Sequence, residues 1–319
     1  MRLVNMLSNK KRAFLFQGVG ADYRNFLDKF DDDQLHTLEQ YCSTVNEQIG
    51  IDLHGYLFTS HELKHTEYDQ MFYDWIAIYT CDYIVYQQYV NSGIKPAMMV
   101  GYSMGLITAM ACGKSISFAA GLQMLQIIYE YPKSSADSCG MGVIVGKTYS
   151  EVYDMIANCK AENDVFIASE NNETCLVISG IKDSVIQVLN TAELQGAIKA
   201  STIHTPYAFH SPYAAKGIEM FVNLVEDTPI YDGEVPIISV FTQTIIQSAS
   251  DLKNELIKNM ASPMNWNASI LKLGEWGIDS FVEVSLDDSL TKISRIINLD
   301  YEFVTYKKFI RLKSAMSAL

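Results

Sequence analysis

Short apolar runs alternate with longer segments of helical spacing along most of the chain. Residues 12–20 hold an apolar run that ends in a glycine turn, and residues 95–100 hold another that leads into Gly101. Residues 34–50 and 67–92 carry apolar and aromatic side chains at helical spacing. Short apolar runs closed by glycine predict buried strands. Strands that alternate with helices in this way predict an α/β layer architecture.

The stretch from residue 140 to residue 204 has a different pattern, in which two helical segments separate short apolar runs. The expected strands are 142–146, 165–169, 174–179 and 198–203, and the expected helices are 149–159 and 183–194. The order β-α-β-β-α-β is that of a ferredoxin-like unit. After it the α/β pattern resumes, with a strand at 236–241, a helix at 266–275 and a strand at 280–284. We therefore predict a small subdomain at residues 139–204, inserted into a larger α/β subdomain formed by residues 1–138 and 205–319.

The chain is acidic, which narrows the choice of partners. Its 319 residues include 24 lysines and arginines and 37 aspartates and glutamates, so the formal net charge is −13. Such a chain has no overall positive field for phosphates, and we do not expect it to bind nucleic acid. Apolar residues make up 49% of the chain and charged residues 19%, which is typical of a globular protein and not of a disordered one.

Cysteine use and apolar run length both favour a cytoplasmic protein. The six cysteines are far apart and form no Cys-x-x-Cys pair, which is typical of reduced cysteines. Residues 1–9 have no sustained apolar segment of the kind found in signal peptides. The apolar stretch 97–113 is interrupted by polar residues and is shorter than the roughly 20 residues that a membrane helix needs. We expect no membrane association.

The sharpest chemical signal is Gly101-Tyr102-Ser103-Met104-Gly105, a G-x-S-x-G motif between an expected strand and an expected helix. A nucleophile elbow needs glycines where the backbone is crowded and a serine at the strained apex. The Ser103 hydroxyl would then face an open site near the positive end of the following helix. We predict that Ser103 is a nucleophile, and the alternative is an ordinary turn.

A serine nucleophile needs a base, and two histidines are the nearest candidates. His210 lies in a loop between Pro206 and Pro212, directly after the last expected strand of the small subdomain. Loops held by a rigid scaffold often carry catalytic groups, but the spacing alone fits a structural histidine equally well. His204 is a rival, and its place at the end of a strand favours a structural role.

One motif suggests a metal site that we do not expect. His61-Glu62-Leu63-Lys64-His65 matches the H-E-x-x-H zinc pattern. Its flanks are polar and turn-like, and no motif for a third ligand follows. We interpret it as a solvated segment and predict no metal.

Taken together, five features resemble a known family. They are Gln17-Gly18-Val19-Gly20 after the first strand, the 101–105 elbow, the ferredoxin-like insert, residues 207–211 (Tyr-Ala-Phe-His-Ser) and residues 262–266 (Ser-Pro-Met-Asn-Trp). Their order and spacing are similar to those of the malonyl-CoA:acyl-carrier-protein transacylases and the acyltransferase domains of polyketide synthases. The resemblance covers roughly residues 14–297. It implies an α/β-hydrolase-like large subdomain with a parallel central sheet, a ferredoxin-like small subdomain and an active site in the cleft between them.

The resemblance also implies a role for individual residues. Ser103 corresponds to the nucleophile and His210 to the general base and acid. The backbone N–H groups of Val19 and Met104 correspond to the oxyanion hole. The family orients its histidine with a backbone carbonyl, and the corresponding residue is Asn259. No bound metal or cofactor is implied, because the acyl group arrives on CoA or on the phosphopantetheine of an acyl carrier protein.

The departures from the family pattern bear on the acyl group. Ile128 stands twenty-five residues after the nucleophile, where malonyl-using members carry an arginine that binds the free carboxylate. Each lost charge-assisted hydrogen bond is worth about 1.5–3 kcal/mol. We expect an acyl pocket formed by Tyr102, Ile128, Tyr207 and Phe209 that accepts non-carboxylated acyl groups. The alternative is that another basic residue holds a carboxylate.

Three functions remain open on these residues. Members without the arginine resemble the acyl hydrolases of trans-acyltransferase polyketide pathways, so we favour an editing acyl-carrier-protein hydrolase that works through an acyl-serine. The first alternative is a trans-acting transacylase that loads an acyl unit from CoA onto an acyl carrier protein. The second is a non-catalytic docking module, which the loss of Gly-Pro-Gly at residues 285–287 (Ser-Leu-Asp) suggests. Both enzymes share the first half-reaction, and residue identities do not separate them.

Binding of a carrier protein depends on the charges at the surface of the enzyme. Carrier proteins are generally acidic, so an acidic enzyme needs local basic patches to bind one. The candidates are residues 10–12 (Lys-Lys-Arg) and a C-terminal cluster of Lys307, Lys308, Arg311 and Lys313. A solvated terminal face explains these residues equally well. We expect the protein to be a monomer.

Overall fold

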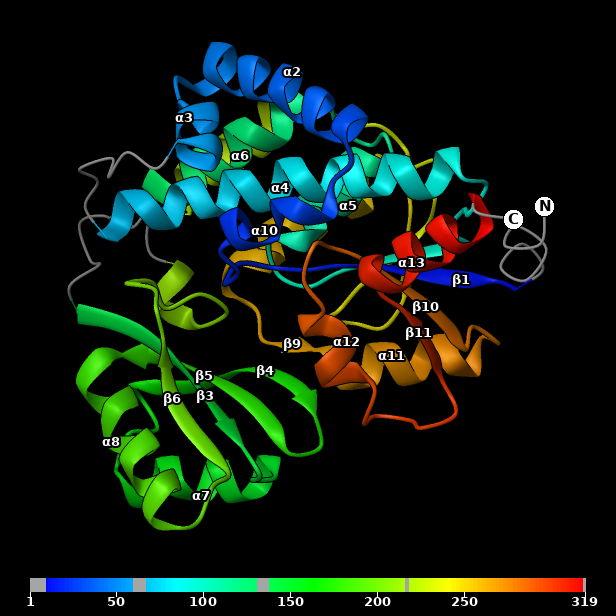
Figure 1. The fold of residues 1–319 in the computed structure, drawn as a ribbon. Helices are drawn as coiled ribbons and strands as arrows, with labels where there is room; N and C mark the ends of the chain where they lie inside the picture. The colour runs from blue at the N-terminus through cyan, green and yellow to red at the C-terminus, as the bar shows by residue number, and fades with distance from the viewer. Residues whose placement is uncertain (1–9, 60–66, 131–137, 216–217, 318–319) are drawn as a thin grey trace.

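The computed structural model describes residues 10–59, 67–130, 138–215 and 218–317, and it contains two sheets (Figure 1). The strands are β1 (Arg12–Phe16), β2 (Met98–Gly101), β3 (Cys139–Val145), β4 (Val165–Asn172), β5 (Cys175–Ile181), β6 (Lys199–Ile203), β7 (Ile237–Ile238), β8 (Ile245–Ile246), β9 (Met264–Asn265), β10 (Ser280–Val284) and β11 (Glu302–Val304). The α-helices are α2 (Asp32–Ile49), α3 (Leu53–Phe58), α4 (Glu67–Asn91), α5 (Gly105–Cys112), α6 (Phe118–Glu130), α7 (Tyr149–Asn158), α8 (Lys182–Leu194), α9 (Glu219–Asp227), α10 (Ala249–Ala261), α11 (Trp266–Glu275), α12 (Ser289–Ser294) and α13 (Tyr306–Ser317). Two short 3₁₀ helices, η1 (Tyr23–Lys29) and η3 (Pro212–Ala215), complete the described elements.

The larger sheet has the strand order β11-β10-β1-β2-β7-β8. Its neighbours are parallel except for β7 and β8, which run antiparallel. At the end of the central strand β1, Phe16 lies opposite Val284 on one side and Gly101 on the other. The carboxyl ends of three strands therefore meet at one edge, where ligands bind in open parallel sheets.

Alternation along β1 divides the core into two layers. Phe14 and Phe16 pack with the helices on one face, chiefly α4, α5 and α6, while Ala13 and Leu15 pack with α11 on the other. Successive side chains of a strand point to opposite faces, so a strand buried on both sides must be apolar throughout. Figure 1 shows α4 and α5 above the sheet and α11 below it.

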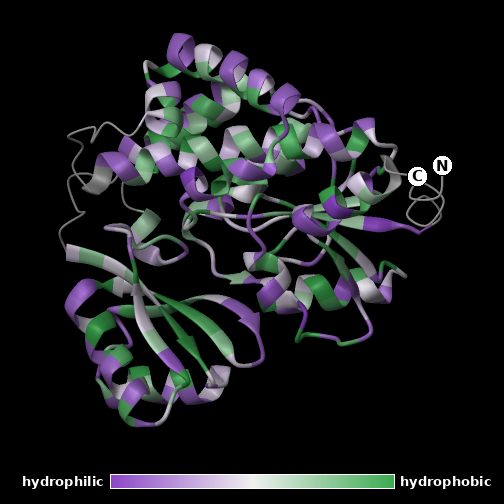
Figure 2. Cartoon of the chain, viewed as in Figure 1, coloured by the Kyte–Doolittle hydropathy of each residue, from purple (hydrophilic) through white to green (hydrophobic). Residues whose placement is uncertain are grey.

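The smaller sheet has the order β6-β3-β5-β4-β9. Its strands are antiparallel except for β9, which pairs in parallel with β4 at Ser169 and Met264. Helices α7 and α8 lie beside this sheet (Figure 1), and its strands carry hydrophobic stretches interrupted by polar positions (Figure 2). The α/β fold with a parallel large sheet and a ferredoxin-like insert is confirmed. The subdomain boundaries at residues 139 and 204 stay a prediction, and β9 adds a strand from outside that range.

Some elements differ from their predicted extents. The strand expected at 236–241 is limited to Ile237–Ile238, because the chain turns back where the Ser239 N–H donates to the Thr244 carbonyl at 2.9 Å. Strand β4 extends to Asn172, three residues beyond its expected end at residue 169. Helices α3, α9, α10, α12 and α13 were not predicted.

Two expectations about the chain as a whole can be compared with the described residues. All six cysteines are free. Among the helices of the described ranges, none is long and apolar enough to cross a membrane.

Candidate active site

The turn between β2 and α5 holds Ser103 in a strained conformation. Its φ angle is +54°, in the left-handed region that non-glycine residues rarely occupy. A side chain at Gly101 would overlap the backbone of Leu106, and one at Gly105 would overlap the carbonyl of Phe16. Glycine on both sides is therefore required for this elbow, which presents the Ser103 hydroxyl beside the start of α5.

His210 lies within hydrogen-bond distance of that hydroxyl. The Ser103 Oγ and the His210 Nε2 are 2.9 Å apart. The Nδ1 of the same ring lies 3.2 Å from the carbonyl oxygen of Ser262. Because a carbonyl can only accept, Nδ1 carries the ring proton and Nε2 is left as the acceptor for the serine.

Burial keeps this histidine neutral. His210 is almost fully buried, and burial lowers its pKa to about 4, while the hydrogen bond to the Ser262 carbonyl acts in the opposite direction. A neutral imidazole is the form that can accept a proton from a serine hydroxyl. His204, the rival candidate, is exposed and does not line the cavity around Ser103.

The prediction that the Asn259 carbonyl orients the histidine is wrong. Asn259 lies in the last turn of α10, whereas Ser262 follows the helix in an extended conformation and turns its carbonyl toward the ring. The side chain of Asn259 has another contact, because its Nδ2 donates to the Ser103 carbonyl at 2.9 Å. The Met260 carbonyl accepts from the His210 N–H, also at 2.9 Å. The end of α10 thus holds both reactive residues.

The loop after β1 passes close to the elbow. A side chain at Gly18 would lie 3.0 Å from the Tyr102 carbonyl and 3.4 Å from the Ser103 Cβ. Val19 lines the same cavity as Ser103, and Met104 precedes the first residue of α5. Within the described residues, neither the Val19 N–H nor the Met104 N–H has a hydrogen-bond acceptor. The first N–H groups of a helix are unpaired and carry partial positive charge, as an oxyanion hole requires.

A cavity of about 400 Å³ opens between the two sheets at this point. Both Ser103 and His210 line it, together with residues from β3, β4, β5 and β6 of the small sheet. Most of the lining side chains are apolar, and no lysine, arginine, aspartate or glutamate is among the described residues that line it. The expected position of the site in the cleft therefore agrees with the geometry.

A family model for the acyl transferase domain matches residues 35–295. The chain belongs to this family. It is 25% identical over 295 residues to the malonyl CoA-acyl carrier protein transacylase of Bacillus subtilis strain 168. The alignment covers 90% of each chain.

Solved structures of the acyl transferase family share the fold. The malonyl CoA-acyl carrier protein transacylase of Coxiella burnetii superposes with a TM-score of 0.82 at 23% identity and covers 97% of each chain. A malonyl-transacylase in complex with a type II polyketide synthase acyl-carrier protein also gives a TM-score of 0.82, at 18% identity, over 93% of this chain and 96% of that one.

Two of the four residues expected in the acyl pocket lie elsewhere. Tyr102 and Phe209 line the cavity, but Ile128 and Tyr207 do not. Ile128, on α6, is buried in the core that also contains residues of α4 and α5. The Tyr207 hydroxyl donates to the Tyr129 carbonyl at 2.6 Å, which turns it away from Ser103.

Tyr102 links the elbow to the small sheet. Its hydroxyl donates to the Asn171 Oδ1 on β4 at 2.8 Å, and its ring meets Trp266 edge-on at 5.4 Å. Burial raises the pKa of Tyr102 to about 12, so the hydroxyl keeps its proton for this bond.

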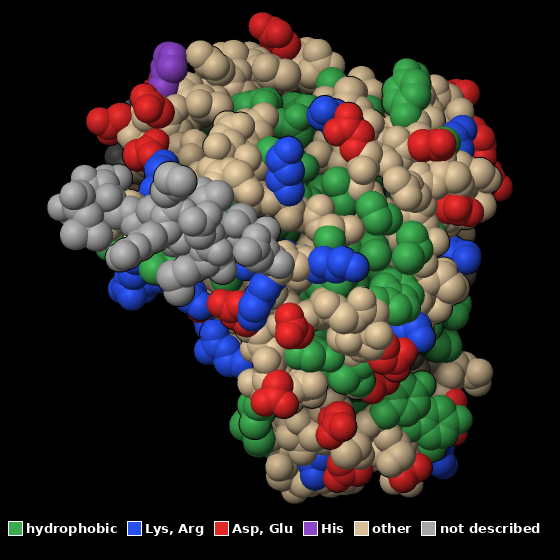
Figure 3. Space-filling view, turned by 90° about the vertical axis from the view of Figure 1, so that its right-hand side faces the viewer, with side chains coloured by type: hydrophobic (Ala, Val, Ile, Leu, Met, Phe, Trp, Pro, Cys, Tyr) green, Lys and Arg blue, Asp and Glu red, His purple; other side chains and the backbone are tan. Residues whose placement is uncertain are grey.

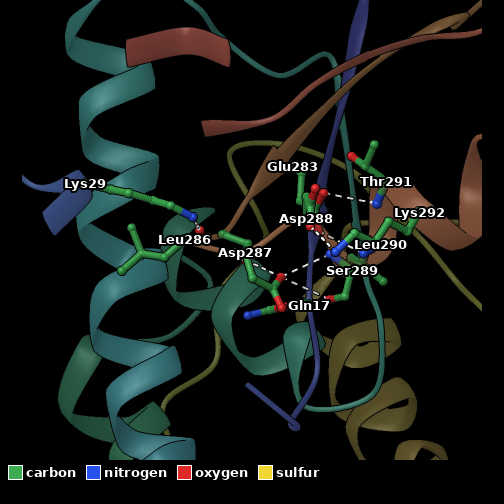
Figure 4. Close-up of polar contacts among 11 residues, drawn as sticks. Gln17, Lys29, Glu283, Leu286, Asp287, Asp288, Ser289, Leu290, Thr291 and Lys292 are labelled. Carbon is green, nitrogen blue, oxygen red and sulfur yellow. Dashed lines mark hydrogen bonds and ion pairs between the residues drawn. The ribbon is translucent and has the colours of Figure 1, made fainter. Parts of the chain in front are cut away.

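The segment that replaces the family's Gly-Pro-Gly forms a polar turn before α12 (Figure 4). The Asp287 carboxylate accepts from the Ser285 hydroxyl at 3.0 Å and from the Ser289 N–H at 3.1 Å. The Ser289 hydroxyl lies 3.0 Å from both the Asp287 carboxylate and the Gln17 Oε1. The turn is thereby tied to the loop that carries Val19.

Tyr23 is the buried centre of the same network. Its hydroxyl donates to the Asp82 Oδ1 at 2.7 Å, accepts from the Leu286 N–H at 3.2 Å and also bonds to the Gln17 side chain. Burial raises the pKa of Asp82 well above its ordinary value. The sequence analysis missed this network, because Asp82 is one polar residue within a helical pattern and nothing in its spacing marks a partner.

Other predicted sites have different outcomes. His61 and His65 lie outside the described residues, and the described ranges contain no cluster of three potential metal ligands.

Arg12 is buried in β1 and cannot belong to a docking patch. Lys10 and Lys308 both approach Glu302, and Lys313 approaches Asp31. Figure 3 shows blue side chains on the face around the termini, interspersed with acidic ones.

We predict an unusually low acid limit for the acylation of Ser103. The rate should stay nearly constant from about pH 7 to about pH 5 and fall to half at about pH 4, where the buried His210 takes up a proton. The measurement is single-turnover acylation by a thioester across this range.

The control is the folded fraction at each pH. In the unfolded chain, His210 takes up its proton near its ordinary pKa of about 6.5. Between pH 6.5 and pH 4 the unfolded state therefore binds more protons than the folded state, and the free energy of unfolding falls as the pH falls through this window. Half-loss of the rate near pH 6.5 in protein that is still folded would contradict the assigned environment of His210.

We predict that Tyr23→Phe lowers the free energy of unfolding by about 1–3 kcal/mol, because the buried Asp82 and Leu286 groups lose a partner. Urea unfolding measures the change. Tyr231→Phe removes the same hydroxyl from an exposed side chain and should leave stability unaltered. An equal effect of the two variants would show that the network contributes nothing.

Proposed function

We propose that this chain is an acyltransferase that moves an acyl group from one thioester to another through an acyl-serine on Ser103. The observation that carries the proposal is the 2.9 Å contact of the Ser103 Oγ with a neutral His210 whose other nitrogen is held by a carbonyl. The unpaired N–H groups near the serine support it as well. The acyl carrier protein in the names of the relatives supports a carrier-protein thiol as acyl acceptor.

The proposed reaction has two matching halves. The His210 Nε2 accepts the proton of the Ser103 hydroxyl as the Oγ attacks the thioester carbonyl. The N–H groups of Val19 and Met104 stabilise the oxyanion, and one such donor is typically worth about 2.7–4 kcal/mol. The carbon–sulfur bond then breaks and His210 returns the proton to the leaving thiolate. In the second half, an incoming thiol gives its proton to His210 and attacks the acyl-serine, the bond between the acyl carbon and the Ser103 Oγ breaks, and His210 returns the proton to the Oγ.

We propose an acyl group without a free carboxylate. The described lining of the cavity has no lysine or arginine, and the helix position of the family's arginine holds Ile128 in the core. A carboxylate buried in such a cavity would lose its hydration without gaining a partner of opposite charge. The malonyl group in the names of the relatives is therefore not proposed as the substrate of this chain.

Transfer is proposed in place of the hydrolysis that the sequence alone favoured. The named relatives are transacylases, and their names support a thiol as the second acceptor. Nothing in the comparisons supports an editing hydrolase. No feature of the cavity favours water over a thiol.

We predict that acetyl-CoA labels Ser103 and malonyl-CoA labels it at least about tenfold more slowly, since the carboxylate loses one or more charge-assisted hydrogen bonds. Mass spectrometry of the intact protein and of its peptides measures the adduct. Ser103→Ala should give none.

Three results would contradict parts of this proposal. No adduct with any acyl thioester would reject catalysis and favour a docking module. Equal labelling by malonyl and acetyl groups would reject the argument from the cavity lining. Release of free acid at a rate that ignores an added carrier protein would favour hydrolysis over transfer.

We also predict that the exposed C-terminal cluster assists carrier-protein docking. Lys307→Glu with Arg311→Glu should lower kcat/KM for a carrier-bound acyl group by about tenfold at low salt, because reversed charges repel an acidic partner. The rate with small acyl thioesters should not change.

The matched control is Lys114→Glu with Lys160→Glu, which makes the same change of net charge at exposed positions elsewhere. It should affect the two substrate types by less than about twofold, as expected for charges far from the docking surface. Equal loss on carrier-bound and small substrates in the C-terminal variant would refute the docking role.

A further inference from the structure

The small sheet has two apolar faces with different coverings. One face packs against α7 and α8, with Ile144, Leu176 and Ile178 in that core. The other face presents a cluster of apolar side chains from four strands. They are Met141 on β3, Ala168 on β4, Val177 on β5 and Ile203 on β6.

This second face forms a wall of the cavity that contains Ser103. All four of these side chains line the cavity, and so does Phe209, which packs against them. An apolar sheet face is normally covered by another layer of structure. Here the cavity lies against this face of the sheet, so a ligand that fills the cavity would pack on the face.

A bulge in β4 shapes this wall. In the pairing with β5, Ile167 lies opposite Ile178 and Ser169 lies opposite Val177, so Ala168 is the extra residue. Bulges of this kind change the direction of side chains and are common beside active sites. As a result, the consecutive residues Ala168 and Ser169 both line the cavity.

The opposite wall is apolar as well. Leu290 and Ile293 of α12 line it, while Met264 extends the sheet wall on β9, where it lies opposite Ser169 of β4. The volume of about 400 Å³ lies in the range of pockets that hold whole small molecules. An acetyl-serine adds only one methyl group to this volume, whereas a longer acyl chain would contact more of the apolar lining.

We propose that the inner face of the small sheet binds an acyl chain several carbons longer than acetyl. Ala168 and Val177 limit the length of the chain. This inference rests on the acyl-serine proposed above, and it adds the substrate class: unbranched, non-carboxylated acyl groups of medium length. Phe209 and Ile203 lie beside the chain, while His210 and Ser103 lie at its thioester end.

The test is the rate of Ser103 acylation by acetyl, butyryl, hexanoyl and octanoyl thioesters of N-acetylcysteamine. Each methylene buried in the cavity should raise kcat/KM by about threefold to fourfold, so hexanoyl should exceed acetyl by roughly 100-fold. A rate that is flat or falls with chain length, with a clear acetyl adduct on Ser103, would overturn the inference and leave the proposed function standing.

Two substitutions should move the profile in opposite directions. Ala168→Leu fills the wall and should lower acylation by octanoyl at least about tenfold while acetyl changes little, and Val177→Ala enlarges it and should shift the optimum to longer chains. Leu194→Ala, on the exposed end of α8, is the control and should leave the profile unchanged. A uniform loss over all chain lengths would indicate damage to the fold and contradict the role in length selection.

A binding measurement makes the test independent of catalysis. Ser103→Ala cannot form an adduct, so calorimetry with this variant compares hexanoyl and acetyl thioesters at equilibrium. Tighter binding of the hexanoyl compound, lost in Ala168→Leu, supports the inference even if no acyl-serine is ever observed. Equal binding of the two compounds would reject it.

Discussion

The contact between Ser103 and His210 is the constraint on which the rest of the site depends. Both residues have positive φ, +54° and +58°, which costs energy at residues other than glycine. Such conformations persist only where the surroundings hold them firmly. The end of α10 does this for both, because it bonds to the Ser103 carbonyl, the His210 N–H and the His210 ring. One helix end thus fixes the distance between nucleophile and base.

The orientation of His210 by a carbonyl has an electrostatic consequence. A carboxylate beside the ring would raise its pKa, whereas a neutral carbonyl in a buried site leaves desolvation dominant. The ring therefore stays neutral at physiological pH and ready to accept a proton. The imidazolium that forms in the reaction has no negative side chain to stabilise it within the described lining, so its charge must be balanced by the oxyanion that forms at the same time.

Much of this arrangement could be predicted from the sequence, and the failures have physical causes. The elbow was predictable because the crowding at Gly101 and Gly105 allows only glycine, and the strands because burial on both faces demands continuous apolar runs. Helix α10 carried a readable signal that was missed, since Ser248 caps it and Leu252, Leu256 and Met260 follow at four-residue spacing. The choice between the carbonyls of Asn259 and Ser262 depends on how the chain leaves the helix. Side-chain spacing contains no information about that exit.

The directions of Ile128 and Tyr207 were also beyond the sequence. Both side chains are apolar or aromatic, so either could line a core or a cavity. The packing around α6 places both of them in the core. Because Ile128 and Tyr207 do not line the cavity, its walls come mainly from the small sheet. This change strengthens the case against a charged acyl group. The titratable side chains that line the cavity in the described ranges are a neutral histidine and a protonated tyrosine, so a lone carboxylate buried there would lose its hydration without gaining a partner of opposite charge.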